Sequence, residues 1–333
     1  MSEGTPPGEA GPRIPAASLP LSARAPGKCI VFGEHGVVHG TPELVFAIDL
    51  ETQVLLRATD RWSLNGDAAA AETHPYLRAA VARFAGRAPT AGIRAVSRIP
   101  RSAGLGSSAA FVAALAAALG ALGGGIDRTA LADAAFAVER DAQGVGSPGD
   151  TSASVAGGFV TINGPPGAPL LWTIERDGRR WEVRRAPDPA WTWIVAYSGI
   201  PRSTATAVES VSRRLGAPDG PELLRRFRQV AEEGLRAIAA EDRTATGRAM
   251  QENHALLETV GVGHPRLTAL RKAVAECSAG AKLTGAGAGG SIVVLPKEGR
   301  EAECVRRLAR AGALAFAVRP SGHGAGLIGP VPP

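Results

Sequence analysis

Cysteine is scarce in this sequence. Only three of the 333 residues are cysteines, Cys29, Cys277 and Cys304, and none of them stands in a CxxC or CxxH pattern. The odd number and the open spacing argue against both a disulfide framework and a zinc site. A protein of the reducing cytoplasm fits this usage best.

Long apolar runs are also missing. The alanine-rich stretch from Ala109 to Leu122 is shorter than a membrane span requires and is closed by three glycines. Residues 1–20 contain early acids and several prolines but no continuous apolar segment, so they predict a disordered leader rather than a signal peptide. Residues 323–333 predict a flexible tail.

Aromatic residues make up only 5% of the chain, and no basic stripe is interleaved with them. Lys and Arg number 37 against 31 Asp and Glu, a net charge of +6, but the arginines are spread over many segments. This composition favours neither a nucleic acid nor a membrane as partner. A modest positive charge would instead attract anionic small molecules.

With 333 residues, of which 45% are hydrophobic, the chain is long enough for a large core and for two domains. Alternating and apolar runs predict strands over 29–32, 44–50, 53–58, 92–99, 159–162, 169–175, 191–197, 281–284, 291–295 and 313–318. The first three would form an antiparallel meander, 169–175 an edge strand and 191–197 a central strand. Helical periodicity predicts helices over 108–122, 128–142 (with Asp127 as N-cap), 221–241, 244–260, 264–278 and 300–311. The mixture indicates an α+β protein.

The segment 99–122 joins a glycine-rich turn to a long apolar helix. A Walker A loop is excluded, because the only Gly-Lys pair lacks the upstream glycine. Gly104 to Ala109 and Gly285 to Gly290 both satisfy a dinucleotide-binding spacing. The first lacks an acidic residue at the end of a following strand, and the second is followed by a strand rather than by a helix, so neither fits a dinucleotide site. The remaining interpretation is an anion site at a helix N-terminus, with Ser107 and Ser108 at its entrance. The alternative is that these serines only cap the helix.

Three further segments combine glycine with charged residues: APGKCIVFGEH at 25–35, ERDAQGVGSPGD at 139–150 and KLTGAGAGG at 282–290. Together with the turn at 100–110 they supply a backbone cradle, a cation, two carboxylates, a hydroxyl and a second glycine loop. Phosphoryl transfer from ATP requires these groups.

These segments, in this order, resemble those of the GHMP kinases, and the resemblance extends from Ala25 to about Val318. Within the superfamily, APGKCIVFGEHGVVHGTPEL, YSGIPRSTATAVESV (197–211) and MQENHALLETVGVGHPRLTALRKA (250–273) are most similar to mevalonate kinases of the short archaeal and bacterial form.

The resemblance implies a two-domain α+β fold, with an N-terminal domain at 21–185, a ferredoxin-like C-terminal domain at 186–322 and the active site in the cleft between them. It implies ATP and Mg²⁺, phosphorylation of the 5-hydroxyl of (R)-mevalonate in isoprenoid biosynthesis, and a homodimer as one assembly. The alternatives are a related kinase acting on phosphomevalonate or on the 3-hydroxyl of mevalonate, and a non-catalytic metabolite-binding relative.

The resemblance also assigns roles to individual positions. It implies Asp150 as the catalytic carboxylate that orients the acceptor hydroxyl and takes its proton late, with Lys28 as the neighbouring cation. It implies Ser108 and Glu139 as the Mg²⁺ ligands. The ATP phosphate loop then comprises Pro100, Arg101, Ser102, Ala103, Gly104, Leu105, Gly106, Ser107, Ser108, Ala109 and Ala110. The substrate-binding positions are His35, Thr204, Gly285 and Ala286.

Each of these residues has a simpler interpretation: Glu139 as a solvated surface acid, Lys28 as a surface lysine, His35 as a loop histidine and Thr204 as a helix cap. The chain also departs from the family pattern in two places. Glu43 and Leu44 replace the expected Ala-Leu pair after the proline of the first segment, and Ala288 stands where glycine is more usual.

Overall fold

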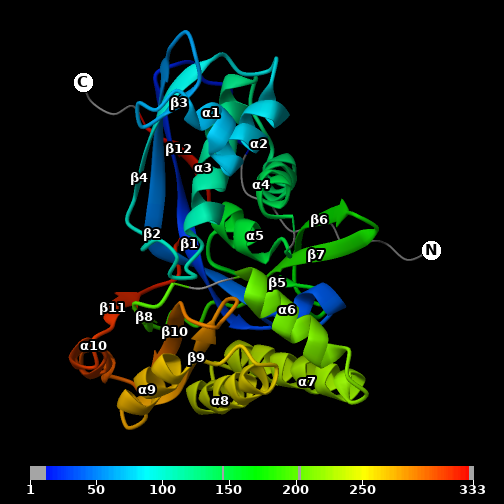
Figure 1. The fold of residues 1–333 in the computed structure, drawn as a ribbon, viewed down its shortest axis with the longest axis vertical. Helices are drawn as coiled ribbons and strands as arrows, with labels where there is room; N and C mark the ends of the chain where they lie inside the picture. The colour runs from blue at the N-terminus through cyan, green and yellow to red at the C-terminus, as the bar shows by residue number, and fades with distance from the viewer. Residues whose placement is uncertain (1–12, 145, 202–203, 330–333) are drawn as a thin grey trace.

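The computed structural model describes residues 13–144, 146–201 and 204–329. Within these ranges the N-terminal part of the chain, with one strand from the C-terminal end, builds an eight-stranded sheet, and the C-terminal part builds a four-stranded sheet, with helices packed on both (Figure 1). The α+β architecture expected from the sequence is confirmed.

The larger sheet is mostly antiparallel. Its strands are β1 (Leu21–Phe32), β2 (Glu43–Ala58), β3 (Ser63–Leu64), β4 (Ala91–Ser97), β5 (Phe159–Ile162), β6 (Leu170–Arg176), β7 (Arg179–Arg185) and β12 (Gly326–Ile328). The order is β12-β1-β2-β5-β7-β6, while β4 pairs with both β2 and β3. β6 therefore lies at an edge, as its sequence predicts.

The predicted meander is wrong in one respect. Residues 44–50 and 53–58 are not two strands but belong to the continuous strand β2, which pairs along almost its whole length with β1. Glu51 and Thr52, which separate the two apolar runs, include neither glycine nor proline, so nothing in the sequence requires a turn there.

The described residues of the N-terminal part form a short 3-10 helix (Val37–His39) and five α-helices: α1 (Ala70–Thr73), α2 (Pro75–Phe84), α3 (Ser107–Leu122), α4 (Arg128–Gln143) and α5 (Gly149–Ala156). Every residue of α3 from Val112 to Ala121 is buried, because its small alanine side chains allow close packing by the sheet and by α4. The predicted cap of α4 is confirmed, since the Asp127 carboxylate accepts a hydrogen bond of 2.8 Å from the amide of Ala130.

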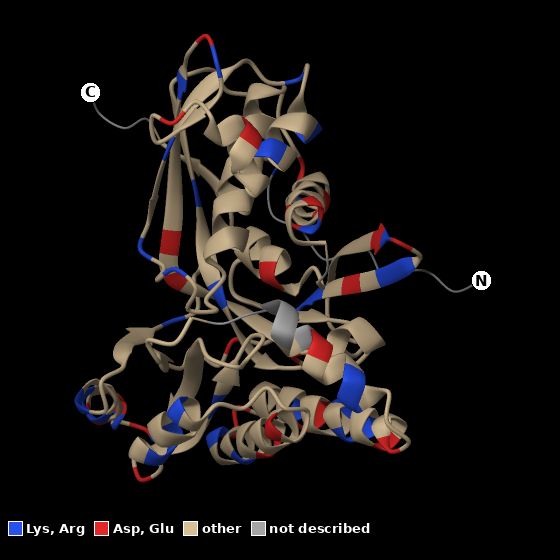
Figure 2. Cartoon of the chain, in the orientation of Figure 1, with Lys and Arg blue, Asp and Glu red and all other residues tan. Residues whose placement is uncertain are grey.

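The smaller sheet contains β8 (Trp193–Tyr197), β9 (Ser278–Thr284), β10 (Ser291–Pro296) and β11 (Leu314–Val318), in the order β11-β8-β10-β9. β8 is an inner strand, as predicted. The helices are α6 (Thr204–Leu215), α7 (Gly220–Ala239), α8 (Arg243–Thr259), α9 (Pro265–Ala273) and α10 (Glu301–Arg310). Charges of both signs are mixed along these helices (Figure 2).

Both ends of the described chain are more ordered than the sequence suggests. Ile14 is buried, and its backbone exchanges two hydrogen bonds with that of Ile126. Residues 326–328 form β12, which pairs with β1 from Ser22 to Arg24. The predicted leader and tail are therefore wrong at these positions, because short apolar segments find open partners on the N-terminal domain. Residues 1–12 and 330–333 lie outside the described ranges. A membrane-spanning helix is absent from the described residues.

Candidate active site

The loop before α3 is shaped by glycines. Gly104 and Gly106 have φ values of 85° and 75°, which side chains rarely adopt. A Cβ on Gly106 would also lie 2.6 Å from Cγ of Lys28, so the loop can pack against β1 only without a side chain there. The backbone is fixed further by the Lys28 amide, which donates a hydrogen bond of 2.9 Å to the carbonyl of Leu105.

The N-terminus of α3 has no side-chain cap. Gly106 is the N-cap residue, and Ser107 and Ser108 already belong to the first helical turn. The interpretation of the two serines as caps is therefore wrong. The amides of the first turn remain available to an anion, which the helix dipole also favours.

The predicted phosphate loop divides into two groups. A cavity of about 530 Å³ is lined by Pro100, Arg101, Ser102, Gly104, Gly106, Ser107 and Ser108. The side chains of Ala103, Leu105, Ala109 and Ala110 are instead buried in the core beneath it. We call this space the loop cavity. The carbonyl of Ala103 accepts a hydrogen bond of 2.7 Å from the hydroxyl of Ser291, which connects the loop to the C-terminal domain.

Ser108 and Glu139 meet at the edge of the loop cavity. The Ser108 hydroxyl donates a hydrogen bond of 3.2 Å to Oε1 of Glu139, which comes from α4 and is only 8% exposed. Gln143, one turn further along α4, donates to the same oxygen at 3.1 Å. The sequence separation of 31 residues is thus closed by packing of α3 against α4, and the interpretation of Glu139 as a surface acid is wrong.

Lys28 and Asp150 form an ion pair. The Lys28 ammonium on β1 lies 2.9 Å from Oδ1 of Asp150, in the first turn of α5. The lysine side chain is fully buried, which excludes an ordinary surface lysine, whereas the Asp150 side chain is 26% exposed. A buried cation thus holds a carboxylate that remains accessible from one side.

That accessible side faces a second cavity of about 450 Å³, which we call the acceptor cavity. Its lining includes Lys28, Glu43, Glu139 and Asp150 from the N-terminal domain and Gly285 and Ala286 from the C-terminal domain. Gln143 lines both cavities. The Ser108–Glu139 pair therefore stands close to where the two spaces adjoin.

His35 connects the two domains. Its ring Nε2 lies 3.0 Å from the carbonyl oxygen of Ala286, and its backbone φ is +61°. His35, Gly285 and Ala286 all line the acceptor cavity, so the structure brings together three of the four predicted substrate positions. Thr204 begins α6, but its side chain lies outside the described part of the structure.

A buried ion pair was not predicted from the sequence. Lys282 on β9 pairs with Glu34, and neither side chain is more than 1% exposed. Burial raises the pKa of Glu34 and lowers the pKa of Lys282, and the attraction between the two charges opposes both shifts. The lysine in the predicted strand AKLT was the available signal, because a charged side chain in a buried strand needs a buried partner.

Ala288 keeps the backbone geometry expected of a glycine. Its φ is +55°, and its amide donates a hydrogen bond of 2.7 Å to the carbonyl of Val262. The substitution noted in the sequence therefore leaves the left-handed turn in place.

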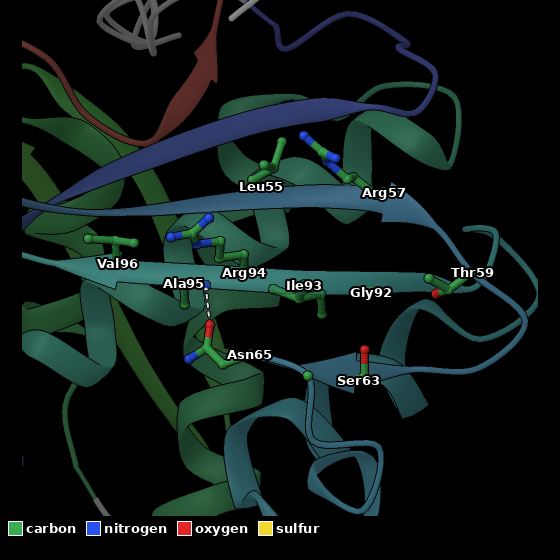
Figure 3. A pocket seen from close by; sticks show the side chains of 11 residues that line it. Leu55, Arg57, Thr59, Ser63, Asn65, Gly92, Ile93, Arg94, Ala95 and Val96 are labelled. Carbon is green, nitrogen blue, oxygen red and sulfur yellow. Dashed lines mark hydrogen bonds between the residues drawn. The ribbon is translucent and has the colours of Figure 1, made fainter. Parts of the chain in front are cut away.

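A third cavity, of about 630 Å³, runs along β4 and contains no acidic residue (Figure 3). Asn65 accepts a hydrogen bond of 2.9 Å from the amide of Ala95, and both residues also line the loop cavity. This third cavity therefore adjoins the loop cavity, and neither Lys28 nor Asp150 lines it.

Comparisons with known proteins identify the family of this chain. Residues 75–158 match the family model "GHMP kinases N terminal domain", and residues 235–314 match "GHMP kinases C terminal". The mevalonate kinase of Archaeoglobus fulgidus is 34% identical over 292 residues, covering 83% of this chain and 93% of that protein. The mevalonate kinase of Pyrococcus horikoshii is 30% identical, covering 91% and 96%. The chain belongs to the GHMP kinase family.

Solved structures share the fold. The Methanococcus jannaschii mevalonate kinase has a TM-score of 0.72 at 22% identity, covering 92% of this chain and 99% of that one. The L. major mevalonate kinase in complex with R-mevalonate has a TM-score of 0.74 at 20% identity, covering 94% and 100%. A Lactococcus lactis galactokinase reaches 0.72 at 18% identity, covering 92% and 95%, so the fold alone does not select the acceptor.

Proposed function

We propose that this chain is a mevalonate kinase, which transfers the γ-phosphoryl group of ATP to the 5-hydroxyl of (R)-mevalonate. The observation that carries the proposal is the Lys28–Asp150 pair, in which a buried cation contacts an accessible carboxylate. This pair lines the acceptor cavity, which adjoins the loop cavity at the N-terminus of α3. Phosphoryl transfer depends mainly on positioning and on neutralising charge, and these groups supply both.

The loop cavity is the proposed site of the ATP phosphates. The left-handed Gly104 and Gly106 shape the loop that lines it, and the amides at the start of α3 favour negative charge. Arg101, on the rim of the cavity, adds a positive charge.

Ser108 and Glu139 are the proposed ligands of Mg²⁺. This ion is usually held by one or two carboxylates together with phosphate oxygens, rather than by an all-protein cage. One carboxylate and one hydroxyl at hydrogen-bond distance, next to the phosphate site, fit that requirement. When bound, Mg²⁺ would neutralise charge on the phosphate oxygens.

In the proposed reaction, Asp150 accepts a hydrogen bond from the acceptor hydroxyl and orients its oxygen toward the γ-phosphorus. The bond between that oxygen and phosphorus forms as the bond from phosphorus to the bridging β,γ-oxygen breaks. The proton passes to Asp150 late in the step, and the bridging electron pair leaves with ADP. Lys28 remains next to Asp150 and, in this proposal, offsets the negative charge of the transferring phosphoryl group.

Mevalonate is favoured as acceptor by the relatives that are at least 30% identical over most of the chain, which are named as mevalonate kinases. A kinase for phosphomevalonate or for the 3-hydroxyl of mevalonate is the alternative with the same machinery. The retention of Lys28, Glu139 and Asp150 argues against a non-catalytic relative. The homodimer and the cytoplasmic location remain predictions from the sequence.

The test is formation of ADP by the purified chain with (R)-mevalonate, 5-phosphomevalonate, galactose and homoserine. We expect turnover with mevalonate to exceed that with each other acceptor, and the phosphorus spectrum of the product to place the phosphate on the primary 5-oxygen. Preference for another acceptor, or phosphate on the tertiary 3-oxygen, would refute the proposed substrate or position.

A further inference from the structure

Glu43 is the residue that replaces the alanine expected from the family pattern, and it lies at the start of β2 on the wall of the acceptor cavity. Although it is acidic, it is only 2% exposed. A carboxyl group is rarely so deeply buried without a specific partner. Its partners are therefore worth identifying, since Glu43 lines the same cavity as Lys28 and Asp150.

The carboxyl of Glu43 rests on the backbone just before Asp150. A Cβ added to Gly149 would lie 2.1 Å from Oε2 and 3.0 Å from Cδ of Glu43, so the carboxyl occupies the volume that a side chain at position 149 would need. The Ser147 hydroxyl donates a hydrogen bond of 3.2 Å to the same Oε2 and accepts one of 3.4 Å from the amide of Gly149. One side chain thus contacts the segment that leads into α5 at two points.

The charged groups that face Glu43 come from three elements. Asp150 on α5 and Glu34 after β1 are acidic, Lys28 on β1 is basic, and Lys282 on β9 lies beyond Glu34. Burial, with the nearby Asp150 charge as a second cause, raises the pKa of Glu43 to about 8. Below that pH the carboxyl is mostly neutral, and it then does not compete with Asp150 for the buried ammonium of Lys28.

We propose that Glu43 is a positioning residue for phosphoryl transfer: its carboxyl group, seated on Gly149 and hydrogen-bonded to Ser147, holds the first turn of α5 so that Asp150 faces Lys28 and the acceptor hydroxyl. This inference rests on the proposed function of Lys28 and Asp150. The close fit between Glu43 and Gly149 makes the two positions interdependent, since a larger residue at 149 requires a smaller one at 43.

The experiment compares four variants at positions 43 and 149, and one control variant, with the parent in steady-state assays of the full chain across pH. Glu43→Ala removes the contact, and we expect kcat to fall by about tenfold or more while KM for ATP changes less, as for a misplaced catalytic group. Gly149→Ala introduces the clash and should also lower kcat. The double variant E43A/G149A lets the new methyl group fill the vacated volume and should recover part of the loss.

Glu43→Gln keeps the shape but cannot ionise. It should retain most of the parent kcat near neutral pH and should lose the decline in kcat that we expect in the parent above about pH 8, where an ionised Glu43 would repel Asp150 and compete for Lys28. Glu232→Gln, a change at a carboxylate on α7 that is about half exposed, serves as the matched control and should follow the parent profile.

Two results would overturn the inference while leaving the proposed function standing. In the first, the parent phosphorylates mevalonate and E43A has the same kcat as the parent. In the second, the kcat of E43Q falls above about pH 8 in the same way as that of the parent. Failure of the parent itself to use any acceptor would instead refute the proposed function. If E43A does not fold, the pH profile of E43Q decides alone.

Discussion

Thr284, just before the glycine loop at 285–290, binds β1 through its hydroxyl group. Oγ1 of Thr284 accepts a hydrogen bond of 3.0 Å from the amide of Ile30 and donates one of 2.9 Å to the Ile30 carbonyl, and all of these groups are buried. The two residues are 254 positions apart in the chain. This contact and the nearby Glu34–Lys282 pair fix one wall of the acceptor cavity to the other.

Replacing Thr284 by valine keeps the shape but removes the hydroxyl. The amide and carbonyl of Ile30 would then be buried without this partner, and we expect the free energy of unfolding to fall by about 2–3 kcal/mol. Thr284→Ser retains the hydroxyl and is the matched control, with a loss of less than about 1 kcal/mol. Denaturant titration measures both, and equal stability of the valine variant and the parent would contradict the role of this contact.

His254 predicts a pH dependence of stability. It is buried, its Nδ1 accepts a hydrogen bond from the amide of Leu283, and burial is the main reason that its pKa is lowered to about 4. The unfolded chain has the ordinary histidine pKa of about 6.5 and so binds more protons between these values. The stabilising contribution is therefore present above about pH 6.5 and is lost as the pH falls through about 4.

Comparison of the parent with His254→Gln isolates this effect. From about pH 7.5 to 4.5, the parent should lose more unfolding free energy than the variant, by on the order of 2 kcal/mol. Parallel pH curves for the two proteins would show that the histidine is not held neutral by its burial. Titrating groups that do not contact His254 are common to both proteins and cancel in the difference.

Glu139→Gln tests the proposed metal site. The amide keeps the size of the side chain but removes the negative charge, so we expect the Mg²⁺ concentration for half-maximal turnover to rise by at least about tenfold. Asp141→Asn changes an exposed acid on the same helix and should leave that concentration as in the parent. An unchanged Mg²⁺ requirement in E139Q would remove Glu139 from the metal site.

The local elements of this fold could be predicted, but several of its contacts could not. The periodicity of 108–122 and the cap at Asp127 depend on neighbouring residues, and the structure agrees with both. The Glu34–Lys282 pair joins positions 248 apart, and the packing of Glu43 on Gly149 depends on the register of β2 against β1 and β5. Sequence periodicity contains no information on such distances.

The candidate site shows the same division. Lys28, Ser108, Glu139 and Asp150 were identified through a resemblance, and the structure brings them together as two pairs, each in direct contact. Gln143 and Ser147 were missed because neither belongs to one of the recognised motif positions, and Glu43 was noted only as a departure from the family pattern. The strand at 326–328 was missed because its three residues are too few for a periodic signal.

The most direct test of the account is the turnover of Asp150→Asn with saturating ATP and (R)-mevalonate, measured together with ATP binding. Asn keeps the shape of the side chain but cannot accept the proton, so we predict a kcat lower by roughly 10² to 10⁴ with an ATP dissociation constant close to that of the parent. A D150N protein that binds ATP and retains near-parent turnover would contradict the central claim that Asp150, paired with Lys28, directs the acceptor hydroxyl.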